Sequence, residues 1–190
     1  IWALPWIEQL GSGKTAIQTI DNMSFINKKW MDFLGLEMPT TVDEFEQVLI
    51  AFRDHASELQ AEFNIDGSII PMSCIVNDGG QDPCILINGF GEGYGDADKG
   101  RHIAVTDDLK VICSATQQGF KDGIAWLHSL YEAGVIDPEA FTQEWSTYVS
   151  KGKSGRYGVC FSWDVANIDN LQDWVPLPAL TADTRNITPQ

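Results

Sequence analysis

The chain has 190 residues, of which 44% are hydrophobic, enough for one domain with a substantial core. Lys and Arg number 12 against 27 Asp and Glu, and the resulting net charge of -15 disfavours nucleic acid and anionic lipid as partners. The longest apolar runs extend over only a few residues, so the sequence predicts no membrane-spanning helix.

The first part of the chain is predicted to be extended before it becomes helical. Residues 1–5 (IWALP) form a candidate strand, and residues 16–26 are rich in the Ile, Thr and Phe that strands favour. A short helix follows over residues 27–36 and is stopped by Gly35. A capping box of Thr41 and Glu44 then begins a helix with one buried stripe at helical spacing: Val42, Phe45, Val48, Leu49 and Phe52.

The rest of the chain alternates strands with helices, which indicates an α/β fold with helices on a mixed sheet. The helix that begins at Ala115 and ends before Gly134 is expected to bury one face, made of Phe120, Ile124, Leu127 and Tyr131. The other predicted elements are a strand within 64–74, a loop over 76–83, a short helix over 84–93, a hairpin of strands 102–105 and 109–113, a helix over 142–151 with Gly152 past its end, a strand over 155–163, a helical turn over 164–168 and an extended exit over 173–180.

Residues 8–17 (EQLGSGKTAI) contain Gly13-Lys14-Thr15, which looks like the end of a phosphate-binding loop. The full motif requires a glycine five positions before Gly13, but Glu8 stands there and its carboxylate would repel a phosphate. The following segment has weak helical periodicity, so no helix N-terminus is predicted to hold the anion. We interpret the stretch as a flexible turn.

The sequence carries no motif for metal binding or catalysis. His55, His102 and His128 lie in three separate predicted elements. Residues 96–100 begin like a calcium loop, but a lysine occupies a ligand position and no glutamate closes the loop, so a solvated acidic loop is predicted. Arg156 stands where a nucleophile elbow would need its last glycine.

The four cysteines are predicted to be free thiols rather than disulfides. None of them forms a CxxC pair, which argues against zinc ribbons and redox motifs. Cys84, Cys113 and Cys160 have apolar or β-branched neighbours that suit small buried side chains, whereas Cys74 carries no such indication.

Trp163 is the residue that points to ligand binding. It lies where a predicted strand ends and a helical turn begins, and ligands of α/β proteins collect at the carboxyl ends of strands. The face of a tryptophan can pack on the apolar face of a sugar ring, with hydrogen bonds from the surroundings. The alternative is a core tryptophan, because large aromatic residues are usually buried.

Three stretches together resemble the extracellular solute-binding proteins of bacterial ABC importers: residues 23–52, 123–141 and 150–168. They look most like the family-1, carbohydrate-type branch, which includes maltodextrin-binding proteins and the lipoproteins of Gram-positive sugar importers. The resemblance covers about residues 1–180 in the family's order. It implies a periplasmic-binding-protein-like fold of type II, with a mixed sheet flanked by helices.

The resemblance further implies two α/β lobes that close on a solute. Residues 1–190 would be most of the second lobe, with residues 1–6 and 173–180 crossing to a first lobe outside this chain. The chain also begins at Ile1 without a signal-peptide pattern, so we expect it to be a piece of a longer protein. The implied partners are a sugar or oligosaccharide and the permease subunits of an ABC importer. The implied location is extracytoplasmic, at a Gram-positive cell surface or in a periplasm, with any lipid anchor outside the chain and no cofactor.

The family's ligand contacts transfer to two loops. Trp163 matches the aromatic residue that stacks on sugar in the maltodextrin-type relatives. Residues 77–83 (NDGGQDP) match the stretch that offers a carboxylate and an aromatic side chain; Asp78 matches the carboxylate, whereas a glycine replaces the aromatic. The predicted ligand-binding set is completed by Asn77, Gln81, Asp82 and Asp164.

Two functions of other classes are also compatible with the sequence. An α/β enzyme domain, such as a hydrolase or transferase acting on carbohydrate, would need a pair of carboxylates with shifted pKa values in a cleft. A structural or adhesive surface domain would bury Trp163 among aliphatic side chains, whereas a binding lobe would expose it over a polar-lined concave face.

Overall fold

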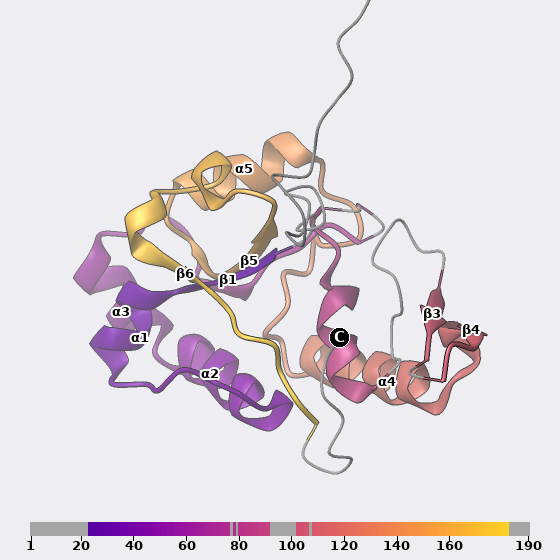
Figure 1. Cartoon of the computed structure of the whole chain (residues 1–190). Helices are drawn as coiled ribbons and strands as arrows, with labels where there is room; N and C mark the ends of the chain where they lie inside the picture. Colours follow the sequence, from indigo (N-terminus) through magenta and orange to yellow (C-terminus); the bar gives the residue numbers. More distant parts are fainter. Residues whose placement is uncertain (1–22, 77, 79, 92–101, 107, 183–190) are drawn as a thin grey trace, which may run out of the picture.

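The centre of the fold is a mixed four-stranded sheet in the order β2-β5-β1-β6 (Figure 1). The computed structural model describes residues 23–76, 78, 80–91, 102–106 and 108–182. Within the sheet, β2 runs parallel to β5, whereas β1 runs antiparallel to both β5 and β6. The strand bounds are β1 (Met23–Asn27), β2 (Ile70–Met72), β5 (Tyr157–Ser162) and β6 (Trp174–Pro176).

Helices cover both faces of this sheet. Figure 1 shows α2 and α4 on one side and α5 on the other. The remaining bounds are α1 (Lys28–Leu34), α2 (Val42–Asp54), α3 (Ala56–Phe63), η2 (Pro83–Phe90), β3 (Ile103–Val105), β4 (Val111–Cys113), η3 (Ser114–Thr116), α4 (Gln118–Glu132), α5 (Trp145–Lys153), η4 (Val165–Asn167) and η5 (Leu171–Asp173). In the described part of the chain, no helix has the length and apolar character needed to cross a membrane.

The strand register sends alternate side chains to two separate cores. Ile26 pairs with Val159, and both belong to the larger core that α2, η2 and α4 cover. Phe25 pairs with Cys160, and both belong to a smaller core completed by side chains of α5 and η4. Every residue of β5 is buried, as expected for a central strand with both faces covered.

The caps of the first two helices are as predicted. Gly35 ends α1 in the left-handed region at φ 66°, which a glycine adopts without strain. Thr41 accepts a hydrogen bond from the Glu44 amide at 3.2 Å, and the Glu44 carboxylate accepts one from the Thr41 amide at 3.2 Å. The predicted stripe of α2 is buried in full.

Two helices differ from the prediction. The sequence does not predict helix α3, because half of the residues in ASELQAEF are polar and only Leu59 is buried. The buried face of α4 is also wrong in part: Ile124 and Tyr131 are exposed, and the buried residues are Gly119, Gly123, Trp126, Leu127 and Leu130. The reason is η2, which packs so closely on α4 that a side chain at Gly123 would overlap Ile87.

Gly152 lies inside α5 rather than past its end. A side chain at this position would overlap Ile168, so the glycine allows α5 to pack against the chain that follows η4. The helix instead gives way to Gly155, whose φ of 70° is left-handed. The short helix predicted over 84–93 is the 3₁₀ helix η2, and the predicted hairpin is confirmed as β3 and β4.

All four cysteines are free thiols, as predicted. Burial raises the pKa of the Cys74 and Cys160 thiols, which keeps both protonated. Cys84 is half-buried, whereas Cys113 is exposed on the β3–β4 hairpin, contrary to the prediction from its neighbours. Several other predictions lie outside the described residues: the strand at 1–5, the Gly13-Lys14-Thr15 turn, Asn77 and the acidic loop at 96–100.

The close packing of β5 leads to a testable prediction at Gly158. A methyl group there would lie 2.7 Å from the Pro71 carbonyl oxygen and would also overlap the Phe52 ring. We expect Gly158→Ala to lower the free energy of unfolding by about 1–3 kcal/mol, because overpacking strains both neighbours. Urea unfolding followed by circular dichroism measures this.

Gly80→Ala is the matched control, since a side chain there meets nothing within 4 Å. We expect the control to keep the urea midpoint of the wild type. Equal midpoints for Gly158→Ala and the wild type would contradict the packing described for β5.

Candidate functional site

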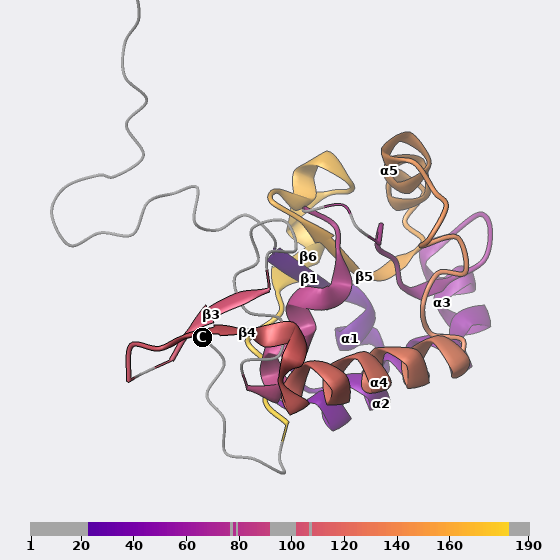
Figure 2. The same ribbon diagram turned by 90° about the vertical axis from the view of Figure 1, so that its right-hand side faces the viewer.

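The two predicted ligand-contacting loops emerge from one edge of the sheet. Because β2 and β5 are parallel neighbours, the chain leaves both strands at the same end. The antiparallel β1 begins at this end, where Met23 pairs with Ser162. Figure 2 views the molecule from this side, with η2 and α4 below the sheet and α5 above it.

Trp163 is the first residue after β5 and is 62% exposed. The alternative interpretation of Trp163 as a core residue is therefore wrong. The turn that follows is fixed by two neighbours of the tryptophan: the Ser162 hydroxyl donates to the Asp164 carbonyl at 2.9 Å, and the Asp164 carboxylate accepts from the Ala166 amide at 2.9 Å. Asp164 thus caps η4 and helps to hold the backbone on which Trp163 is displayed.

The loop after β2 is a tight turn held by its own polar groups. The Gln81 amide donates to the Asp78 carbonyl at 2.9 Å, and the Gln81 carbonyl accepts from the Ile75 amide at 3.1 Å. Asp78 is half-buried, and its carboxylate also accepts from the Gly80 amide at 3.3 Å. Asp78 is therefore partly accessible at the sheet edge.

Gln81 and Asp82, two of the predicted ligand-binding residues, are both buried. Asp82 accepts a hydrogen bond from the Cys84 amide at 2.8 Å and caps η2, with Pro83 at the first helical position. These two residues therefore connect the loop to η2.

Tyr148 of α5 joins the ends of the two strands that carry the loops. Its hydroxyl accepts the Phe161 amide at 2.9 Å and lies 3.1 Å from the Phe161 carbonyl and 3.3 Å from the Ser73 carbonyl. The side chain is fully buried, and burial raises the pKa of its phenol, so the hydroxyl keeps the proton that it donates.

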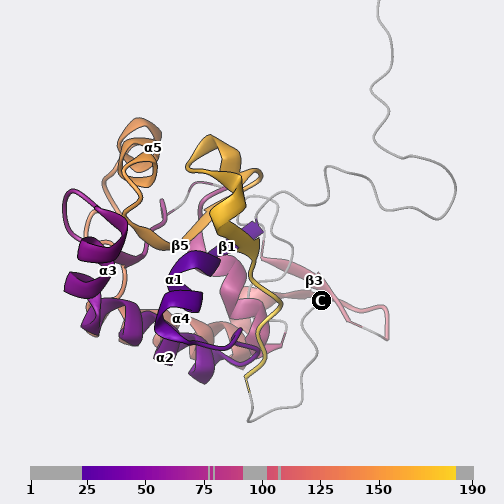
Figure 3. The same ribbon diagram turned by 90° about the vertical axis from the view of Figure 1, so that its left-hand side faces the viewer.

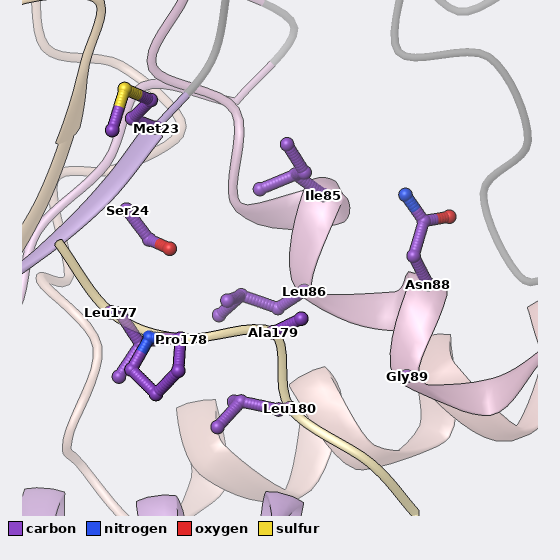
Figure 4. Close-up of a pocket in the computed structure, with 10 residues that line it drawn as sticks. All are labelled: Met23, Ser24, Ile85, Leu86, Asn88, Gly89, Leu177, Pro178, Ala179 and Leu180. Carbon is purple, nitrogen blue, oxygen red and sulfur yellow. The ribbon is translucent and has the colours of Figure 1, made fainter. Parts of the chain in front are cut away.

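An apolar pocket of about 240 Å³ opens beside the same edge. Figure 4 shows it between the start of β1, η2 and residues 177–180. Its floor is made by Leu86, Leu177 and Leu180, which are buried. None of the predicted ligand contacts lines this pocket.

A second pocket, of about 260 Å³, lies beside the opposite ends of β2 and β5. Two carboxylates meet there, since Asp137 and Glu139 both form ion pairs with Lys151. Asp137 is buried, and it also accepts from the Ser73 hydroxyl at 2.7 Å. This network ties α5 to the chain at the end of β2. Among the described residues, no group of three His, Cys, Asp or Glu side chains is placed to hold a metal ion.

Comparison with known proteins shows which proteins this chain resembles. No model of a known protein family matches it. It is 39% identical over 168 residues to the fructooligosaccharide ABC transporter substrate-binding protein FusA of Streptococcus pneumoniae, a match over 88% of this chain and 30% of FusA. The structure of FusA in complex with kestose superposes with a TM-score of 0.79 and 37% identity, covering 96% of this chain and 36% of that chain.

Over nearly its whole length the chain is thus similar to one part of a carbohydrate-type solute-binding protein of an ABC transporter. The HMO-binding ABC-transporter-associated solute-binding protein of Bifidobacterium longum infantis matches with a TM-score of 0.73 and 27% identity, over 89% of this chain and 35% of that one. Lipoprotein LipO of Bacillus subtilis is 25% identical over 134 residues, which cover 68% of this chain and 25% of LipO. The chain thus spans about a third of the length of FusA. The predicted fold, one α/β lobe of the type II class, is confirmed.

The structure brings the described candidate residues to one edge of the sheet, although not in equal roles. Trp163 and Asp78 have accessible side chains, Asp164 is exposed and caps a helical turn, and Gln81 and Asp82 are buried. Sequence reasoning missed Tyr148, the residue that holds the two loops together. An aromatic residue in a short amphipathic helix gives no sign that its hydroxyl reaches two strand ends.

Removal of the Tyr148 hydroxyl tests this connection. We expect Tyr148→Phe to lower the free energy of unfolding by about 1–3 kcal/mol, because the Phe161 amide would lose a buried hydrogen-bond partner. Urea unfolding of the variant and the wild type measures the difference. Tyr131→Phe is the matched control, since Tyr131 is exposed, and we expect its midpoint to be unchanged. Equal effects of the two substitutions would contradict the role of the Tyr148 hydroxyl.

Proposed function

We propose that this chain is one lobe of a two-lobe protein that captures an oligosaccharide for an ABC importer. The observation that carries the proposal is the exposed indole of Trp163 at the carboxyl end of β5, next to the loop that contains Asp78. An apolar aromatic face with nearby hydrogen-bonding groups is the combination that fits a sugar ring. The likeness to FusA, whose structure is known in complex with kestose, supports the same class of solute.

Ligand contacts in this proposal come from Trp163, Asp78, Asn77 and Asp164. Trp163 stacks on the ring, and the polar side chains hydrogen-bond to hydroxyl groups of the sugar. Gln81 and Asp82, which are buried, contribute by fixing the loop. The sugar hydroxyls then meet acceptors whose backbone positions are already set, which limits the entropy lost on binding.

The rest of the mechanism depends on a second lobe. A solute that touches both lobes favours the closed state through its differential affinity for that state, and the importer recognises the closed form. Residues 1–6 and 173–180 are the proposed crossings between lobes. Of these, residues 174–176 form β6, and the chain then continues in extended form to Thr181, which bridges to Thr41 at the start of α2 (Figure 3).

The proposed partners are the permease subunits of the importer, and the proposed location is extracytoplasmic. The resemblance to LipO, a lipoprotein, supports attachment through a lipid anchor outside this chain. No covalent chemistry is part of the proposed function, since the relatives are substrate-binding proteins.

A ligand screen tests this function. In a thermal-shift panel of sugars and peptides on the two-lobe protein, we expect kestose or a related oligosaccharide to raise the melting temperature, because a ligand that binds only the folded state stabilises it. Trp163→Ala should weaken binding about tenfold or more, a loss of about 1.4 kcal/mol, while leaving the ligand-free melting temperature unchanged. Trp163→Phe, which keeps an aromatic face, is the control. A panel in which only peptides bind would contradict the proposal.

Separating the lobes leads to a further prediction. We expect the chain of residues 1–190 to fold by itself but to bind the same sugar at least about a hundredfold more weakly than the two-lobe protein, because it offers half of the contacts and no enclosure. Isothermal titration calorimetry of both proteins measures the ratio. Similar affinities would show that closure of two lobes contributes nothing.

A further inference from the structure

A second tryptophan reaches the edge that carries Trp163. Trp145 is the first residue of α5 and is 40% exposed. Its ring packs against Tyr148, with centroids 5.9 Å apart and an interplanar angle of 34°. One side of the indole is thus supported by a buried ring, while a large part of the side chain faces solvent.

The hydrogen bonds of Tyr148 locate Trp145 relative to the sheet. Residues three apart lie on the same face of a helix, so Trp145 and Tyr148 share the face of α5 that meets the sheet. The Tyr148 hydroxyl contacts Ser73 and Phe161, which lie at the carboxyl ends of β2 and β5. Because α5 leads back to the start of β5, its first residue lies closest to the edge where β5 ends.

The chain after Trp163 lies alongside the same helix. Gly152 near the end of α5 packs against Ile168, and Tyr148 shares a core with Val165. Figure 2 shows α5 and this segment standing on the same side of the sheet, with the chain after β2 passing between them. Trp145 begins α5 and Trp163 follows β5, so two exposed tryptophans belong to elements that pack against each other.

We propose that Trp145 is a second aromatic platform, which binds a distal ring of an oligosaccharide whose nearer ring stacks on Trp163. This inference rests on the proposed function and deepens it: the site is elongated and selects for chain length. Each platform binds the apolar face of one ring, so a short sugar reaches Trp163 alone and a longer one reaches both. The polar turn at Asp78 lies at the same edge and forms hydrogen bonds with the hydroxyl groups of the sugar.

Calorimetry on the two-lobe protein with sucrose, kestose and nystose tests the inference. Trp145→Leu keeps apolar packing on Tyr148 but removes the aromatic face. We expect this substitution to lower the affinity for nystose about tenfold, because one aromatic contact is lost, and to change the affinity for sucrose by less than about twofold. Trp145→Phe should restore most of the nystose affinity. Trp163→Ala should lower the affinity for every sugar that the wild type binds.

Phe33→Leu is the matched control, since Phe33 is 43% exposed and packs edge-on against Phe63 in the α1–α3 region, away from the site. It should leave all three affinities unchanged. Unchanged nystose affinity in Trp145→Leu, or an equal loss for sucrose and nystose, would overturn the second platform while leaving the proposed function intact. A wild-type protein that binds none of the three sugars, nor any other sugar of the panel, would overturn both.

Discussion

The shared hydrogen bonds of one buried hydroxyl hold the candidate site together. Tyr148 reaches from α5 to Phe161 of β5 and to Ser73, the first residue after β2, and so links the two parallel strands where the chain leaves them. The Lys151 ion pair with Asp137, one helical turn further on, attaches the same helix to the chain beside β2. Two turns of α5 therefore fix the relative positions of two loops that are about 85 residues apart in sequence.

The close packing around strand β5 requires a small residue within it. The strand is buried on both faces and flanked by β2 and β1, and at Gly158 the neighbouring Phe52 and Pro71 leave no room for a side chain. The abrupt change to the exposed Trp163 follows from the Ser162 and Asp164 hydrogen bonds, which turn the chain out of the sheet. A buried central strand followed by an exposed indole suits a binding platform, because hydrogen bonds hold the backbone of the turn that carries the indole.

The sequence predicts the local features well and the tertiary ones less so. The capping box at Thr41, the αL glycine at Gly35 and the strand β5 follow from residue types in the local sequence, and the structure has all three. The buried face of α4 and the interior position of Gly152 depend on which element packs against each helix, and no single-helix periodicity contains that information. The two site loops came from family resemblance, whereas the burial of Gln81 and Asp82 reflects a cap on η2 that only the folded loop reveals.

The carboxylates and the tryptophans at this edge differ in how much of their binding capacity remains available to a solute. Asp78, Asp82 and Asp164 each accept a hydrogen bond from a backbone amide close in sequence, so part of their acceptor capacity is already used in shaping the loops. The indoles of Trp163 and Trp145, by contrast, retain large exposed areas. An anionic solute would be repelled by a chain whose net charge is -15. A neutral, ring-shaped solute needs only apolar faces and a few fixed hydrogen-bond partners. The chemistry of this edge thus disfavours an anionic ligand and is compatible with the neutral sugar that we propose.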